Sequence, residues 1–385
     1  MRLPLLVVVL LSGCAPERPW CEDKAALPEL KRCAGCTPTV KEKIVSPDRE
    51  RSFHIAFVAE GFARDDLPRF ENITRTWLFD FTERMDREVP GLTPMLNASW
   101  IDFRDLAPDD GFVLGSCATQ MRGVHILVDA ERMNELVPET LGRFDVIVVV
   151  VNTPTRYREN GTLAWYGSRS VVMMNSWSNG NVFAHELGHA LFGLHDEYTE
   201  LESSIERVST SAASDEDLSA RDIAAFFSAN VSLNPSSPKF GGERQGVEGA
   251  MGYQLGAYRF GEACLMNDGE SAMCPVCQKA AEERVRARRS ASITNPKCGL
   301  RLSPSPSTPG QFDLLVAAFD WDGVKEMRLR TPASAQWTTT PPANSAMASQ
   351  LFTSVSPPAV GDLFVEAVCV DRKGHETSVR VDLAR

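Results

Sequence analysis

Three of the chain's six histidines lie within eleven residues, between His185 and His195. The segment opens with His185-Glu186-Leu187-Gly188-His189. On a helix, residues four positions apart share a face, so the imidazoles of His185 and His189 can bind one zinc ion at about 2.0 to 2.1 Å each. Glu186 then lies beside the metal, where it can act as general base on a zinc-bound water. The segment therefore predicts a helix that carries a catalytic Zn2+ centre.

The other residues of this helix argue against a surface helix with scattered polar groups. Ala184, Leu187, Gly188, Leu191 and Phe192 make the remainder of the helix apolar. Buried in such surroundings, three ionisable groups need a partner to offset their desolvation. A bound metal supplies that partner.

The third zinc ligand has two candidates after the helix. Gly193 is expected to end the helix, because glycine readily takes the left-handed conformation at a C-terminal cap. The metzincin spacing HExxHxxGxxH places this glycine one residue earlier, while its last histidine coincides with His195. Counting from the first histidine favours His195, and counting three residues from the glycine favours Asp196. Either side chain can bind zinc, and the other can orient a ligand.

Residues Gly193 to Tyr198 read Gly-Leu-His-Asp-Glu-Tyr. Together with the HExxH motif they resemble the signature of the bacterial IgA-peptidase family of metzincin-like zinc metallopeptidases. Further likeness extends over residues 52–290 and includes Ala229 to Ser232 and the later Cys-Leu-Met and Cys-Pro-Val-Cys segments. The resemblance implies Asp196 as the third ligand, with His195 as the alternative, and Met266 as the Met-turn methionine beneath the zinc.

This resemblance implies a zinc-dependent endopeptidase that acts on a protein or peptide substrate. It does not transfer specificity for immunoglobulin A. One alternative is a non-catalytic surface lipoprotein, an adhesin or assembly factor, although such a protein does not need Glu186 as a base. A zinc hydrolase that cleaves a cell-wall amide is a further alternative.

Residues 52–297 are predicted to form an α/β metzincin-like domain, a twisted mixed sheet with the HExxH helix packed on it. His54 to Ala59 reads as a strand, and residues 65–89 follow with apolar side chains at helical spacing. The β-branched run Val146 to Val151 suits a central strand covered on both faces. Val171 to Met174 is predicted as an edge strand, along which an extended substrate would bind.

Residues 298–385 are predicted to form an immunoglobulin-like β-sandwich. Helical periodicity is nearly absent there, and Phe312 to Phe319, Lys325 to Leu329, Leu363 to Val370 and Thr377 to Leu383 alternate or run β-branched between turns.

The N-terminus predicts an exported lipoprotein. Residues 1–13 have a short basic start and an apolar run too short to span a bilayer, and Leu11-Ser12-Gly13-Cys14 resembles a lipobox. Lipidation of Cys14 would anchor the chain without crossing the membrane. Ala15 in place of aspartate predicts the outer membrane. Residues 14–51 are expected to form a tether and a cysteine-containing segment.

Export also sets the expectation for the cysteines. Of the chain's ten cysteines, nine remain once Cys14 is set aside. Disulfides are the expected state in an oxidising compartment. Cys33 and Cys36 together with Cys274 and Cys277 resemble a four-thiolate zinc set, but their long separation favours disulfides instead. The net charge of −11, with no basic run, makes nucleic acid an unexpected partner.

Overall fold

A computed structural model describes residues 39–43, 45–48, 51–102, 113–114, 116–119, 125–127, 144–152, 161–166, 169–199, 228–232, 234–241, 245–251, 253–290, 296–304, 308, 311–320, 324–330, 338–339, 347–355 and 364–382. The lipidation predicted at Cys14, and the pair Cys33 and Cys36, lie outside the described residues.

A six-stranded sheet forms the centre of the first part of the chain. Its strands follow the order β1-β3-β2-β6-β8-β7. Their bounds are β1 Thr39–Lys43, β2 Phe53–Glu60, β3 Leu96–Asp102, β6 Val146–Val151, β7 Gly161–Tyr166 and β8 Arg169–Asn175. Strands β3, β2, β6 and β8 are parallel, whereas β1 and β7 pair antiparallel at the two ends. The predicted mixed sheet is confirmed.

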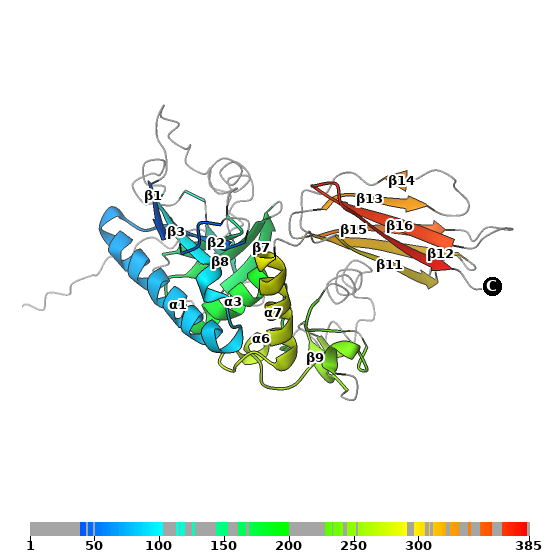
Figure 1. The fold of residues 1–385 in the computed structure, drawn as a ribbon, viewed down its shortest axis with the longest axis horizontal. Helices are drawn as coiled ribbons and strands as arrows, with labels where there is room; N and C mark the ends of the chain where they lie inside the picture. Colours follow the sequence, from blue (N-terminus) through cyan, green and yellow to red (C-terminus); the bar gives the residue numbers. More distant parts are fainter. Residues whose placement is uncertain are drawn as a thin grey trace, which may run out of the picture.

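Three helices cover one face of this sheet: α1 (Leu67–Glu88), α3 (Gly180–Phe192) and α7 (Pro275–Arg289). Figure 1 shows them together on one side of the strands. Alternate residues of β2, such as Ile55 and Phe57, join the same apolar cluster as residues of all three helices. All six residues of β6 are buried, as its β-branched sequence predicts for a central strand.

The prediction that Val171 to Met174 form an edge strand is wrong. They belong to β8, which pairs with β6 on one side and with β7 on the other. The edge strand is β7, whose antiparallel pairing with β8 runs from Gly161 opposite Met174 to Tyr166 opposite Arg169. A substrate cannot add to β8, because both of its edges are already hydrogen-bonded.

The segment predicted as a tether also contributes to the sheet. Strand β1 pairs with β3, with Thr39 opposite Asp102 and Lys43 opposite Ala98. Four of its five residues are exposed. Charged, exposed sequences are common on edge strands, where they discourage pairing with other chains. That composition made β1 look like a solvated tether.

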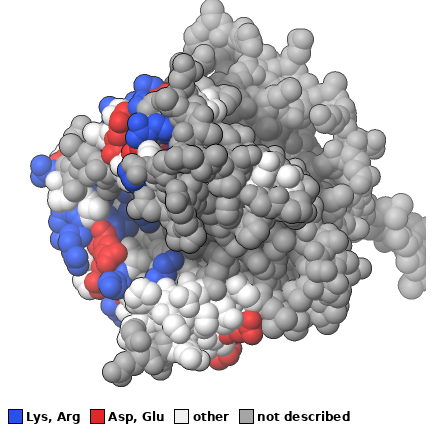
Figure 2. Space-filling view, turned by 90° about the vertical axis from the view of Figure 1, so that its right-hand side faces the viewer, with Lys and Arg blue, Asp and Glu red and all other residues white. Residues whose placement is uncertain are grey.

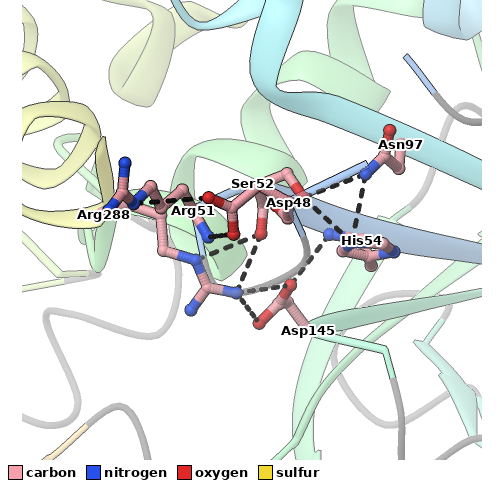
Figure 3. Close-up of polar contacts among 7 residues, drawn as sticks. All are labelled: Asp48, Arg51, Ser52, His54, Asn97, Asp145 and Arg288. Atoms are coloured by element: carbon pink, nitrogen blue, oxygen red, sulfur yellow. Dashed lines mark hydrogen bonds and ion pairs between the residues drawn. The ribbon is translucent and has the colours of Figure 1, made fainter. Parts of the chain in front are cut away.

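A polar network joins the last helix to the start of the central strands (Figure 3). The Arg288 guanidinium donates to the Ser52 carbonyl at 2.8 Å and to Asp145 Oδ1 at 2.9 Å. Asp145 also accepts from the backbone N–H of His54 at 2.8 Å. Because Arg288 lies in the last turn of α7, the network fixes the C-terminal end of this helix against the sheet.

Shorter elements complete this part of the chain. They are η1 (Arg64–Asp66), η2 (Thr93–Met95), β4 (Cys117–Thr119), β5 (His125–Leu127), η4 (Pro238–Phe240), β9 (Val247–Ala250), β10 (Tyr253–Arg259) and α6 (Leu265–Asp268).

The C-terminal part consists of strands without a described helix. Its elements are β11 (Lys297–Pro304), β12 (Phe312–Phe319), β13 (Val324–Arg330), β14 (Thr338–Thr339), β15 (Met347–Val355), β16 (Phe364–Asp371) and β17 (Glu376–Asp382). They form two antiparallel sheets, β11-β12-β15 and β14-β13-β16-β17. The immunoglobulin-like assignment stays a prediction. The predicted boundary between residues 297 and 298 falls inside β11.

A disulfide connects the two C-terminal sheets. Cys298 of β11 is bonded to Cys369 of β16. Around it, Leu314 and Val316 of β12 share an apolar cluster with Met327 of β13. The expected disulfide chemistry is therefore present in this part of the chain.

Acidic and basic side chains lie interspersed on the described part of the face in Figure 2. Ion pairs on the second C-terminal sheet, between Arg328 and Glu376 and between Arg330 and Glu366, follow the same mixed pattern. Among the described residues, no helix is long and apolar enough to cross a membrane.

Candidate metal centre

Helix α3 presents the HExxH residues with both ends capped. At its start, the Asn179 side chain accepts from the backbone N–H groups of Asn181 and Val182. At its end, Gly193 takes the left-handed conformation with φ 66° and ψ 31°, as predicted. Its N–H donates to the His189 carbonyl at 3.0 Å. The chain therefore turns back toward α3 directly after the second histidine.

Three side-chain atoms converge at this turn. His185 Nε2 lies 3.0 Å from Asp196 Oδ1 and 3.2 Å from His189 Nε2. His189 Nε2 lies 3.2 Å from the same Asp196 oxygen. Three ligands of a tetrahedral zinc, each about 2.0 to 2.1 Å from the metal, are separated by about 3.3 Å. The triangle thus has nearly the size that one zinc ion requires.

In each imidazole, the hydrogen bond made by Nδ1 fixes Nε2 as the atom that faces the triangle. His185 Nδ1 donates to the Leu265 carbonyl at 3.0 Å, and His189 Nδ1 donates to the Leu194 carbonyl at 2.7 Å. A carbonyl only accepts, so both Nδ1 atoms carry the hydrogen. When the rings are neutral, the Nε2 lone pairs of His185 and His189 therefore point toward each other and toward the Asp196 carboxylate oxygen. A shared metal ion satisfies all three atoms, so the donor set fits a metal.

Asp196, and not His195, completes the triangle. Of the two groups of potential metal ligands among the described residues, the one at α3 consists of His185, His189 and Asp196. The buried Asn230 side chain holds the segment in place. It accepts from the His195 N–H at 2.8 Å and donates to the His195 carbonyl at 2.9 Å. Between the two candidates that the spacing left open, the geometry favours Asp196.

Comparison with known sequences assigns the family. Residues 44–216, which contain the whole triangle, match the family described as IgA Peptidase M64. This match covers residues 44–216 only, less than half of the chain. The family resemblance noted from the sequence is confirmed, and the chain is a homologue of metallopeptidases. No curated protein sequence matches the chain significantly.

Two solved structures align with this chain over most of its length. Wild-type OgpA from Akkermansia muciniphila is 11% identical, with 86% of this chain and 93% of that chain covered and a TM-score of 0.28. Catalytically inactive OgpA in complex with an O-glycopeptide substrate is 10% identical, with 86% and 92% covered and a TM-score of 0.29. At these TM-scores the likeness supports no statement about this chain's own activity.

Burial and charge shift the titration of the M64 site residues. Burial raises the pKa of Glu186, and the two histidines oppose that rise. Burial alone would lower the pKa of His189, but the neighbouring Asp196 carboxylate raises it to about 9. Burial would raise the pKa of Asp196, but His189 and the hydrogen bonds from both histidines hold it well below its usual range. For His195, burial lowers the pKa to about 4.

Met266 lies directly against the helix that carries the histidines. It is fully buried in α6. A side-chain carbon placed on Gly188 would lie 2.8 Å from the Met266 sulfur, so only a glycine leaves room for this contact. The Met266 carbonyl accepts from the Glu197 N–H at 2.7 Å. The residue predicted as the Met-turn methionine therefore packs between α3 and the segment that carries Asp196.

Sequence reasoning gave no role to several residues around this M64 site. Asn230 was noted only as part of the family resemblance, although it holds the segment on both sides of His195. Tyr198 stacks near His185, with ring centroids 6.2 Å apart. Glu197 is fully buried beside three cysteines that carry free thiols: Cys264, Cys274 and Cys277. Disulfides are the expected state for Cys274 and Cys277, but both residues carry free thiols.

The contact between Gly188 and Met266 predicts the effect of one added methyl group. Gly188→Ala should destabilise the protein by about 1 to 3 kcal/mol through overpacking, reduced by the roughly 1 kcal/mol that alanine gains as a helix former. Urea unfolding measures the difference. Gly261→Ala is the matched control, because a side-chain carbon there meets nothing within 4 Å. A midpoint for Gly188→Ala above that of the wild type would contradict this packing.

The pairing of His189 with Asp196 predicts how pH affects the chelator-treated protein. Because the folded-state pKa of His189 is raised from 6.5 to about 9, its contribution to stability is complete below pH 6.5 and is lost as pH rises through 9. The melting temperature of metal-free wild type should therefore fall across this window relative to His189→Gln. Parallel curves for the two proteins would show that the pairing adds no stability.

Proposed function

We propose that the chain is a zinc-dependent endopeptidase that hydrolyses peptide bonds in proteins. The observation that carries the proposal is the triangle of His185 Nε2, His189 Nε2 and Asp196 Oδ1, whose sides are 3.0 to 3.2 Å. Both histidine hydrogens are engaged by backbone carbonyls outside the triangle. The match to the M64 peptidases supports the same class of reaction.

His185, His189 and Asp196 would hold the zinc, in a set of three protein ligands as is usual for catalytic zinc sites. When bound, zinc supplies Lewis-acid polarisation of the scissile carbonyl and makes water more acidic. The Asp196 side chain is 30% exposed, compared with 13% for His185 and 12% for His189. Solvent and substrate therefore have access from the side of the carboxylate.

Glu186 is the proposed general base. It precedes Leu187 on α3, is 7% exposed, and interacts electrostatically with both histidines and with Asp196. Burial raises its pKa, which makes the carboxylate a stronger base once it is ionised. The carboxylate takes a proton from the attacking water and returns it to the leaving amine.

The substrate peptide is proposed to bind along β7. This strand ends the sheet and pairs only with β8 among the described strands. An extended peptide gains affinity by adding its backbone hydrogen bonds to such an edge. The proposal replaces the earlier assignment to β8, whose two edges are both paired.

The N-terminal signals lead to a proposed location. Cleavage before Cys14 and lipidation of that cysteine would leave an exported lipoprotein held at the outer membrane by its acyl chains alone. A protein or peptide is the proposed substrate partner. The binding-protein alternative predicts a bound metal without any peptide cleavage, so activity separates the two functions.

Replacement of the proposed base should abolish cleavage without removing the metal. Glu186→Gln keeps the size of the side chain but cannot accept the proton, so casein or peptide-library cleavage should fall about 10² to 10⁴-fold. Its zinc content, measured by mass spectrometry, should equal that of the wild type. Unchanged cleavage by this variant would contradict the general-base role, and zinc without cleavage in the wild type would favour the binding protein.

The third ligand is tested by a pair of neighbouring substitutions. Asp196→Ala should lower the zinc content by one equivalent and abolish cleavage, because two histidines alone hold zinc weakly. His195→Ala should retain both properties, since its backbone and not its imidazole is held by Asn230. The opposite pattern would make His195 the ligand.

A further inference from the structure

A second cluster of metal-binding side chains lies behind the proposed catalytic centre. It consists of Cys264, Cys274, Cys277 and Glu197, all buried, with one potential ligand atom from each within 4.8 Å of the others. We propose that this cluster, here called the thiolate site, binds a structural zinc ion. The inference does not depend on the peptidase activity.

Distances within the thiolate site fit ligands around one tetrahedral ion. Cys264 Sγ and Cys277 Sγ lie 3.7 Å apart. Two thiolates at about 2.3 Å from a tetrahedral zinc are separated by about 3.8 Å, whereas a disulfide requires about 2.05 Å. Glu197 Oε1 lies 3.6 Å from Cys274 Sγ and 3.1 Å from Cys277 Sγ. These values approach the separation of about 3.5 Å expected between a thiolate and a carboxylate oxygen on zinc.

Local sequence explains how two of the thiols reach one point. Cys274 is the N-cap of α7, and Cys277 lies in its first turn. The Cys-x-x-Cys spacing at the start of a helix is common in structural zinc sites. The helix N-terminus also stabilises the negative charge of thiolates. From the preceding turn, Cys264 accepts the N–H of Cys274 at 3.3 Å.

The burial of the Glu197 carboxylate is an independent argument for a cation at the thiolate site. Its side chain is fully buried. Asn230 donates to Oε1 at 2.8 Å, but Oε2 has no hydrogen-bond partner among the described residues. No ion pair to this carboxylate is found among them either. A buried carboxylate is stable when it is paired or coordinates a metal, and the potential metal ligands next to Glu197 among the described residues are the three thiols.

A disulfide satisfies this group of side chains less completely than a metal. Joining any two of the three cysteines leaves one thiol outside the bond, and Glu197 Oε2 still has no partner among the described residues. One zinc ion engages all four groups. The thiols that bind it release their protons to solvent, and no oxidant is needed.

A metal ion at the thiolate site would hold in place the segments that position the ligands of the catalytic centre. Glu197 directly follows Asp196, and its N–H donates to the Met266 carbonyl at 2.7 Å. Cys264 directly precedes Leu265, whose carbonyl accepts from His185 at 3.0 Å. An ion held by Glu197 and Cys264 would therefore connect the Asp196 segment to the turn that orients His185.

Cobalt substitution distinguishes the two sites, because only thiolate ligands give a sulfur-to-cobalt charge-transfer absorption. The full-length chain is freed of metal under reducing conditions and titrated with Co2+. The wild type should bind two equivalents and develop this absorption. The double variant His185→Ala, His189→Ala should bind one equivalent with the absorption intact. Cys277→Ser should bind one equivalent without it, and Glu197→Gln should bind cobalt more weakly at the thiolate site.

Two controls separate loss of a ligand from loss of the fold. Val276→Thr places a polar group at the adjacent buried position of α7 and should leave the absorption unchanged. Glu186→Gln should keep both equivalents, so that failure of the peptidase proposal does not affect this one. Circular dichroism confirms that each variant is folded.

Two results would overturn the thiolate site. One is the absence of thiolate absorption in the folded, reduced wild type. The other is a disulfide between two of the three cysteines in protein isolated without reductant, detected by differential alkylation and mass spectrometry. Stoichiometric zinc in that isolated protein, with all three thiols reduced, supports the site.

Discussion

Two backbone carbonyls determine the chemistry that this site can perform. The Leu265 and Leu194 carbonyls accept from Nδ1 of His185 and His189 and thereby direct both Nε2 atoms to one point. Helix α3 supplies the spacing of the imidazoles, but the carbonyls come from segments that follow it. Without them each ring could turn or take the other tautomer, and the triangle with Asp196 would be lost. The cap at Gly193 and the packing of Met266 on Gly188 matter because they place those carbonyls.

Asp196 and Glu197 link two clusters of different chemistry. The Asp196 side chain reaches the histidines, and the Glu197 side chain reaches the cysteines. Asn230 contacts the backbone of His195 and the carboxylate of Glu197, so one buried amide holds both ends of the segment. Its hydrogen bonds satisfy the His195 backbone groups and one Glu197 carboxylate oxygen, which would cost free energy if buried without a partner. The two clusters are therefore one peptide bond apart at this segment.

Local signals made part of this structure predictable. The HExxH spacing, the glycine cap and the β-branched run of β6 each depend on neighbouring residues, and each was recognised from the sequence. Strand pairing depends on distant residues, so the local sequence indicates neither the pairing of β1 with β3 nor the two paired edges of β8. Glu197 lies 80 residues from Cys277, and no local pattern shows that they meet. The general expectation of disulfides is met by Cys298 and Cys369, whose pairing no local pattern indicates, but not by the thiols beside Glu197.

Burial assigns different roles to the two proposed ions. At the histidine triangle, three protein ligands leave a coordination position free, and Asp196 is 30% exposed. At the thiolate site, four protein ligands would close the coordination sphere, and all four residues are buried. Catalytic zinc requires an open position for water and substrate, whereas structural zinc has none. The same metal would thus be reactive at α3 and inert at the start of α7, because the protein leaves solvent access at only one of them.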